Sequence, residues 1–455
     1  MKRNRVLLPL LFGMFSMTQI NVVGSIGITE LVCYVCAPFV FIKDISFLRK
    51  DGFMLVIWLS IFAMIGCCLA SWHNDTAMPF FLRGLAVTYS LFALPICMHR
   101  ILRENLYGLR WILMGLCISM IINIFVFRTS VEVSMMSGGV DGAGTASLIM
   151  SGPLFWLQRL GGWITLPAKG WYLNMPMPYL AVAPIIMTIF TVMTTETGRS
   201  ALLYALGGVA IILVGRKKVS TMEYIQRHFV AWVVISLTFI GIFSSAYKYL
   251  AIHGYINELA QQKYERQTKG KSGALAVLMG GRSELFMGIY ACSKKPFWGF
   301  GPWNSDENGY NLEFLAKYGD LEAYEEYAKG RELAMKYGYQ AEQVQSHSHI
   351  IGFWVRYGLL AFPFWLYILY CMYRHCRRNM AAIPHWYGYF ALALPALAWH
   401  VIFSPYGDRV PDCLFITCLL IANAVRRGAI RLPAEMILEV VKIDPASASR
   451  YNRWL

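Results

Sequence analysis

Apolar runs of about twenty residues recur along most of the chain and limit its fold more than any other feature. A bilayer core about 30 Å thick is crossed by about 20 apolar residues in a helix. Only 15% of the 455 residues are charged, whereas soluble domains carry about 25%. A soluble enzyme is therefore excluded, as are a coiled coil, a disordered chain and a disulfide-stapled secreted module. The clear runs are residues 6–22, 28–43, 52–72, 79–98, 108–127, 174–194, 199–215, 228–249, 350–372, 384–403 and 410–425.

The basic residues orient these runs, because Lys and Arg gather in the cytoplasmic loops of membrane proteins. The net charge of +15 comes from 41 Lys and Arg against 26 Asp and Glu. The short loops at 23–27 and 73–78 contain no Lys or Arg and are placed outside. The basic residues placed inside are Lys2, Arg3 and Arg5, then Lys43, Arg49 and Lys50, and then Arg100, Arg103 and Arg110.

The alternation of basic inner loops with outer loops continues to the C-terminus only if one more segment crosses the membrane before residue 174. Without it, the basic clusters at 216–218, 374–378 and 426–427 fall outside. The remaining material is the weakly apolar stretch 142–162, which Pro153 interrupts. We therefore predict about twelve transmembrane helices with both termini in the cytoplasm. The sixth is expected to pack among other helices, because a carbonyl freed by proline has no partner in lipid.

The prediction is an all-α polytopic membrane protein in four parts. Residues 1–250 contain transmembrane helices 1–9, and residues 251–349 form a large outer loop with short helices. Residues 350–425 contain transmembrane helices 10–12, and 426–455 form a cytoplasmic tail. The outer loop has a cluster of acidic residues between positions 313 and 342, and function on a membrane scaffold is usually carried by such a loop.

Several polar features are interpreted as structural or incidental. Cys33-x-x-Cys36 has redox or zinc spacing, but no second pair and no His lie nearby, so core packing is favoured. Cys292 is alone in the outer loop, which argues against a structural disulfide there. Asn74-Asp75-Thr76 fits the glycosylation pattern by chance. Glu30, near the outer end of the second run, is interpreted as a solvated carboxylate.

No motif supplies a metal site or a phosphate-binding loop. The sequence has no Gly-rich phosphate loop after a strand, no His-Glu-x-x-His and no Asp-rich pair. If the substrate is phosphorylated, cationic side chains must therefore neutralise it.

Two arginines are candidates for that task. Arg199, in Gly198-Arg199-Ser200, begins the eighth predicted span on the outer side. A guanidinium there is costly unless it reaches water or an anion; alternatively it extends to the surface or pairs with Glu196. Arg282 precedes Ser283, which is expected to cap a short amphipathic helix whose N-terminal amides favour anions. The alternative for Arg282 is a solvated surface arginine.

Two of the nine histidines, His347 and His349, lie where the outer loop returns to the membrane. Helix positions i and i+2 point to different faces, so at most one of them is expected to face a shared site. A single histidine at the end of a span is more often a structural hydrogen-bonding residue. Two basic sites on the same outer surface weaken that alternative.

The order of these motifs resembles the O-antigen ligase and O-antigen polymerase superfamily. Gly281-Arg282-Ser283 is followed by Pro296-x-x-Gly299-x-Gly301, and Gly358 lies eleven residues after His347. The resemblance covers residues from roughly 140 to 370. It implies a GT-C-like glycosyltransferase of the bacterial inner membrane that uses an undecaprenyl diphosphate-linked glycan, with its active site on the periplasmic side.

The resemblance also implies roles for single residues. Arg199 and Arg282 match the arginines of the family, and His347 takes its histidine position because of the spacing to Gly358. The family often has Asn after this histidine and an acidic residue two before the glycine, where this chain has Ser348 and Arg356. His349 therefore stays an alternative base. Arg199, Arg282, His349, Lys294 and Lys295 are the expected substrate-binding residues.

This chemistry needs permanently charged groups and a neutral base. Arginine makes bidentate contacts with phosphate oxygens, and stabilising charge on a leaving group is usually the largest catalytic effect. Neutral imidazole can take the proton of the acceptor hydroxyl. The family implies an inverting reaction without metal or other cofactor.

The expected acceptor is the lipid A core or another glycan, and no nucleic acid is involved. A polymerase that joins repeat units on the same lipid carrier is the closest alternative. A lipid or anion transporter is less favoured, since the sequence shows no clear internal repeat or broken helix.

Overall fold

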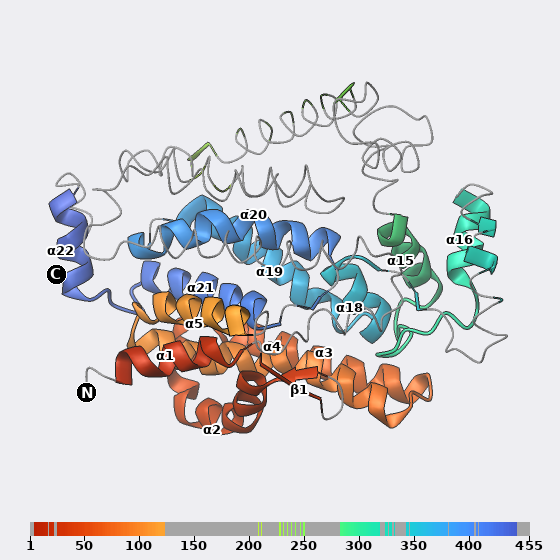
Figure 1. Ribbon diagram of the computed structural model, residues 1–455, viewed down its shortest axis with the longest axis horizontal. Coiled ribbons are helices and arrows are strands. Elements are labelled where there is room, and N and C mark those ends of the chain that lie inside the picture. The colour runs from red at the N-terminus through yellow and green to blue at the C-terminus, as the bar shows by residue number, and fades with distance from the viewer. Residues whose placement is uncertain are drawn as a thin grey trace.

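The part of the chain that the computed structural model describes is mostly helical (Figure 1). The structure describes residues 4–16, 18–21, 25–122, 283–318, 343–344, 346–380, 382–404, 406–407 and 409–443, with single positions between 208 and 250 and short pieces between 324 and 332. The helices are α1 (Asn4–Met14), α2 (Ile28–Asp51), α3 (Met54–His73), α4 (Met78–Glu104), α5 (Gly108–Ile122), α15 (Ser283–Lys294), α16 (Tyr310–Tyr318), α18 (His349–Tyr357), α19 (Phe362–Arg374), the π-helix η2 (His375–Asn379), the 3-10 helix η3 (Pro384–Trp386), α20 (Tyr387–Phe403), α21 (Arg409–Arg426) and α22 (Ala434–Ile443).

Three of these helices, α2, α3 and α4, are long and apolar enough to cross a membrane. The shorter α20 is also apolar over its 17 residues. Their length and composition agree with the helical membrane protein that the apolar runs predict. The segments from 123 to 207 and from 251 to 282, with the fifth-span end, sixth and seventh predicted spans, Arg199 and Arg282, lie outside the described residues.

The first predicted span differs from expectation. A continuous helix over 6–22 is wrong, because α1 ends at Met14 and the chain then forms an antiparallel hairpin of β1 (Gln19–Asn21) and β2 (Ser25–Gly27). After the helix, Ser16 Oγ donates to the Phe12 carbonyl at 2.6 Å, and Gln19 pairs with Gly27 in the hairpin. Eleven helical residues rise only about 17 Å, so α1 alone is shorter than the bilayer core.

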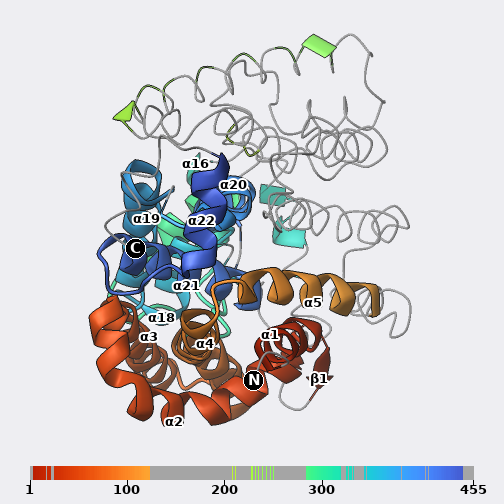
Figure 2. The same ribbon diagram turned by 90° about the vertical axis from the view of Figure 1, so that its left-hand side faces the viewer.

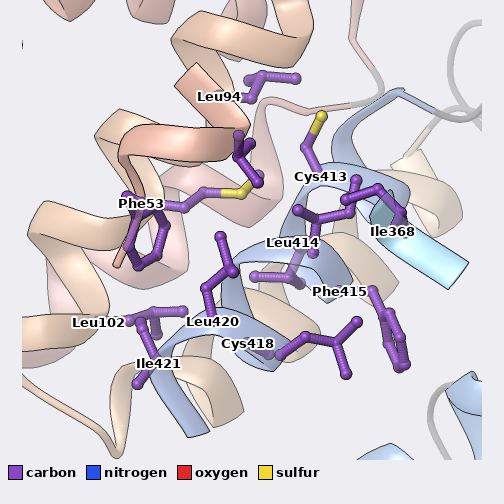
Figure 3. Packing of buried hydrophobic residues seen from close by; sticks show 14 of the residues in the cluster. Phe53, Leu94, Leu102, Ile368, Cys413, Leu414, Phe415, Cys418, Leu420 and Ile421 are labelled. Carbon is purple, nitrogen blue, oxygen red and sulfur yellow. The ribbon is translucent and has the colours of Figure 1, made fainter. Parts of the chain in front are cut away.

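The core is centred on α21, which is buried on all sides over most of its length. It packs against α2, α4, α19 and η2, and Figure 2 shows α4 between α2 and α3 on one side and α21 on the other. A helix that is apolar on every face is expected in such a central position. Figure 3 shows four side chains of α21, which are Leu414, Phe415, Leu420 and Ile421, in one cluster with side chains of neighbouring segments. These neighbours are Phe53, Leu94, Leu102 and Ile368.

The bundle has two chemically different ends. At one end, the C-terminus of α2 meets α4 through Asp44–Arg100 at 2.9 Å and Asp51–Arg103 at 2.8 Å. At the other end of α3, the turn into α4 contacts the segment that follows α15. Figure 1 places α15 and α16 at the end of the molecule opposite α22 and the start of α1. Loop residues far apart in sequence therefore meet at one end.

Helices α1 and α5 cross at two glycines. A Cβ atom on Gly115 would lie 2.7 Å from the Met14 nitrogen and would overlap the Leu10 carbonyl, and one on Gly13 would lie 2.8 Å from the Leu116 nitrogen. Small residues allow such close approach of helix backbones in membranes.

We expect Gly115→Ala to destabilise this crossing by about 1–3 kcal/mol, because the added methyl group must push two backbones apart. The matched control is Gly407→Ala, where an added Cβ meets nothing within 4 Å. The measurement is the fraction of detergent-solubilised protein that stays monodisperse after heating. Equal melting of the two variants would contradict the packing argument.

Candidate functional site

His347 and Glu284 come together from two separate motifs. The His347 Nδ1 atom lies 3.8 Å from Glu284 Oε1, and the two side chains are 38% and 35% exposed. Glu284 is the second residue of α15, and α15 packs against α18, which begins two residues after His347. The start of α15, which follows Arg282 in the chain, thus lies beside His347.

The glycine motif Pro296–Gly301 is attached to the C-terminal end of α18. The Phe300 nitrogen donates to the Val355 carbonyl at 2.7 Å, and the Leu359 nitrogen donates to the Phe297 carbonyl at 3.1 Å. Trp354 Nε1 donates to the Pro296 carbonyl at 2.7 Å. The bond from Phe300 satisfies a carbonyl that the end of α18 leaves free, and the other two bonds attach the motif to Trp354 and Leu359.

Glycine is required on both sides of this contact. Gly299 and Gly358 have φ of 68° and 71°, a region that favours glycine. A Cβ on Gly299 would lie 2.6 Å from the Val355 carbonyl oxygen, and one on Gly358 would overlap the Phe297 carbonyl. The predicted tenth span is consequently two helices, α18 and α19, separated at Gly358; a single helix over 350–372 is wrong.

The turn between α3 and α4 also contacts the glycine motif. Asn74 Nδ2 donates to the Gly299 carbonyl at 3.3 Å, and Asn74 Oδ1 accepts from Lys295 Nζ at 3.3 Å. The Phe80 ring stacks on Trp303 with centroids 4.1 Å apart. Asn74 in the incidental-looking Asn-Asp-Thr tripeptide is therefore a packing residue that holds the glycine motif.

Lys294 and Lys295 both have protein partners. Lys294 Nζ lies 2.8 Å from Glu313 Oε1 on α16 and 5.0 Å from the centre of the Tyr290 ring. The hydrogen bond with Glu313 raises the pKa of Lys294 and lowers the pKa of Glu313. Lys295 bonds Asn74 and lies over the Phe300 ring. The two lysines thus connect α15 and its following loop to neighbouring elements.

His349 lies in the interior, unlike His347. It is 1% exposed; its Nδ1 lies 2.7 Å from the Ser404 carbonyl and its Nε2 lies 3.3 Å from Asp412 Oδ2. Its ring packs edge-on against Trp365 with centroids 4.7 Å apart. Ser348, which caps α18, donates to the Val401 carbonyl at 3.1 Å. The two histidines have different surroundings, but not for the predicted reason: α18 begins at His349 and His347 precedes it, so the two do not share a helix.

Three charged residues, Glu30, Arg409 and Asp412, form buried pairs that the sequence did not lead us to predict. Glu30 is 4% exposed and lies 3.2 Å from Arg409 Nε, so its interpretation as a solvated carboxylate is wrong. Asp412 is 1% exposed. A charged residue at the start of an apolar run is costly to bury unless a partner lies beside it. Arg409 and Asp412 both lie at the start of such a run, so their positions already indicated buried partners.

Cys292 is an inert residue of this region. It is buried and free, and burial raises the pKa of its thiol, which disfavours the reactive thiolate. Among the residues that the structure describes, no group of three or more His, Cys, Asp or Glu side chains is arranged to hold a metal ion.

Comparison of the chain with family models, with curated proteins and with solved structures gives no match. The functional interpretation therefore depends on the motifs and on the geometry described above.

Proposed function

We propose that the chain is a membrane glycosyltransferase of O-antigen ligase type. It transfers a polysaccharide from undecaprenyl diphosphate to a hydroxyl of the lipid A core or of another glycan. The observation that carries this proposal is the meeting of distant motifs: Glu284, two residues after Arg282, lies 3.8 Å from His347. The glycine motif Pro296–Gly301 binds the helix that follows this histidine.

In the proposed reaction, Arg199 and Arg282 bind the diphosphate and His347 is the general base. The acceptor oxygen attacks the anomeric carbon while its proton passes to the imidazole. The bond from that carbon to the phosphate oxygen breaks, and the electron pair leaves with the diphosphate, whose charge the guanidiniums stabilise. Attack opposite the leaving group inverts the configuration. Lys294 and Lys295 reach a substrate only by exchanging Glu313 and Asn74.

The proposed setting is the bacterial inner membrane, with about twelve spans and the reaction on the periplasmic side. Helices α2, α3 and α4 support the membrane location. The α3–α4 turn, which contains no Lys or Arg, touches the glycine motif. At the other end of α3, Arg427 contacts the Lys50 carbonyl at 3.5 Å. Arg427 and Lys50 thus lie at the end of α3 opposite this turn, and the positive-inside rule expects such residues in the cytoplasmic loops.

The break between α18 and α19 is the observation that most favours the transporter alternative, because transporters use discontinuous helices at their binding sites. Here, however, the backbone at the break is bonded to Phe297 and Phe300. It also packs against Gly66, where an added Cβ would lie 2.7 Å from the Tyr357 carbonyl. The backbone groups at the break are thus bonded to other parts of the same chain and do not face a substrate. This favours the enzyme over the transporter.

The test is to incubate the purified protein with a lipid diphosphate-linked glycan and candidate acceptors in the presence of EDTA. We expect transfer of the whole glycan to a lipid A core acceptor in one step. A ladder of products growing by one repeat unit on the lipid carrier would identify the polymerase. No product with any acceptor, together with uptake of the lipid or an anion by proteoliposomes, would overturn the enzyme in favour of the transporter.

A further inference from the structure

We propose that Glu284 is a positioning residue that orients His347 by accepting its Nδ1–H, so that Nε2 is the atom that takes the proton. This inference rests on the proposed function, because it assigns a role to a group beside the proposed base.

One nitrogen of the His347 ring is shielded from solvent although the side chain as a whole is partly exposed. The side chain is 38% exposed, yet its Nδ1 atom is buried and has no hydrogen-bond partner. The Glu284 carboxylate lies on that closed side, with Oε1 3.8 Å from Nδ1. A hydrogen bond of normal length needs the two atoms to approach by about 0.9 Å. Catalytic hydrogen bonds often tighten in this way when substrate binds.

Packing holds the two residues in register. The helix of Glu284 and the helix after His347 share one apolar cluster, formed by Ala291, Cys292, Phe300, Val344 and Val355. The cluster therefore fixes α15 against α18.

The chain before His347 is fixed as well. The Val344 nitrogen donates to the Asn304 carbonyl at 2.8 Å, and Asn304 Nδ2 donates to the Val344 carbonyl at 2.7 Å. After His347, Ser348 caps α18 and bonds Val401. With both flanks held, only small side-chain rotations remain to bring His347 and Glu284 together.

The chemistry requires such an orienting group. A neutral imidazole has one N–H and one acceptor nitrogen, and only the acceptor nitrogen can take a proton. A carboxylate on Nδ1 selects the tautomer whose Nε2 is free. When the acceptor hydroxyl loses its proton to Nε2, the imidazolium that forms lies beside a negative charge. The proton then passes from Nε2 to water, and the base is regenerated.

The structural alternative is that Glu284 only stabilises the N-terminus of α15, as acidic residues do in a first helical turn. Glu435, in the first turn of α22, supplies the matched control. Both variants, Glu284→Ala and Glu435→Ala, remove one such charge, but only the first removes a neighbour of His347.

The first experiment is kinetic. We expect Glu284→Ala to lower kcat about 10- to 100-fold, with little change in KM for the lipid diphosphate donor, since a general base contributes about 10²- to 10⁴-fold. Glu284→Gln should retain more activity, because its amide oxygen can accept the same Nδ1–H. In a His347→Ala background, Glu284→Ala should have no further effect. A further loss of similar size in that background would overturn the proposal.

The second experiment does not depend on activity. Protein with ¹⁵N-labelled histidine is placed in nanodiscs at about pH 8, and the His347 signal is identified by its loss in His347→Ala. We expect the Nδ1–H tautomer in the wild type and in Glu435→Ala, and a mixture in Glu284→Ala. An unchanged tautomer in Glu284→Ala would overturn the pairing even where transfer is observed. A Glu284-dependent tautomer without transfer would support the pairing while removing the proposed function.

Discussion

Alanine at Arg199 or at Arg282 is expected to reduce glycan transfer by at least about a hundredfold, without lowering the amount of protein in the membrane. In the proposed reaction the diphosphate gains charge as the glycosidic bond breaks, and removing one preorganised donor to such a charge costs about 10²- to 10³-fold in kcat. Lysine in either position keeps the charge but loses the bidentate contact, so it should restore only part of the rate. The measurement is the initial rate of transfer by purified variants, normalised to folded protein.

The control is Arg377→Ala in the π-helix η2, where Arg377 Nη1 donates to the Tyr373 hydroxyl at 2.9 Å. This exposed arginine belongs to the basic group predicted to lie in the cytoplasm, and its loss should leave the rate unchanged. His347→Ala should lose more transfer per folded molecule than His349→Ala. Normal surface glycan in cells that carry either Arg199→Ala or Arg282→Ala would remove the mechanism.

The long apolar helices were the most predictable part of the fold. Apolar runs at 28–43, 52–72 and 79–98 correspond to α2, α3 and α4, because a bilayer imposes nearly the same length on the run and on the helix. The helices are longer than the runs where charged turns follow. Asp44 on α2 and Arg100 on α4 form an ion pair at 2.9 Å, which keeps both helices regular beyond the apolar stretch.

The features that depend on partners far away in sequence were not predictable. The break at Gly358 is stabilised by hydrogen bonds to the backbone of Phe297 and Phe300, and no periodic pattern in the sequence predicts that contact. Glu284 likewise becomes a candidate functional residue only because His347, from another part of the chain, lies beside it. A single sequence gives the chemistry of each motif, whereas the pairing of motifs is set by tertiary packing.

The second large effect concerns Asp412, and hydrogen-bond counting gives its basis. His349 Nδ1 lies 2.7 Å from the Ser404 carbonyl, which can only accept, so Nδ1 carries a hydrogen. On the other side of the ring, Nε2 faces Asp412 Oδ2 at 3.3 Å. A neutral imidazole and an ionised carboxylate would leave two acceptors facing each other. A hydrogen bond between these two atoms therefore needs a hydrogen on one of them, as N–H of an imidazolium or as O–H of a carboxylic acid.

We expect Asp412→Ala to lower the free energy of unfolding by about 3–5 kcal/mol, the cost of leaving one member of a buried ion pair without its partner. If the pair is instead neutral, the loss falls to about 1–3 kcal/mol, for an unsatisfied imidazole nitrogen. In either case Asp412→Asn should be much milder, because the amide can donate to Nε2 of a neutral ring. The measurement is the apparent Tm of purified protein in detergent.

Replacing both partners separates the pair from the space it fills. The double variant His349→Leu with Asp412→Leu removes both polar groups at once, and a buried ion pair replaced by apolar residues is often no less stable. We therefore expect it to recover much of the stability that Asp412→Ala loses. Equal destabilisation by Asn and by Ala at position 412 would show that no shared proton holds α18 to α21, and would leave apolar packing around Trp365 and Tyr406 as the force that joins them.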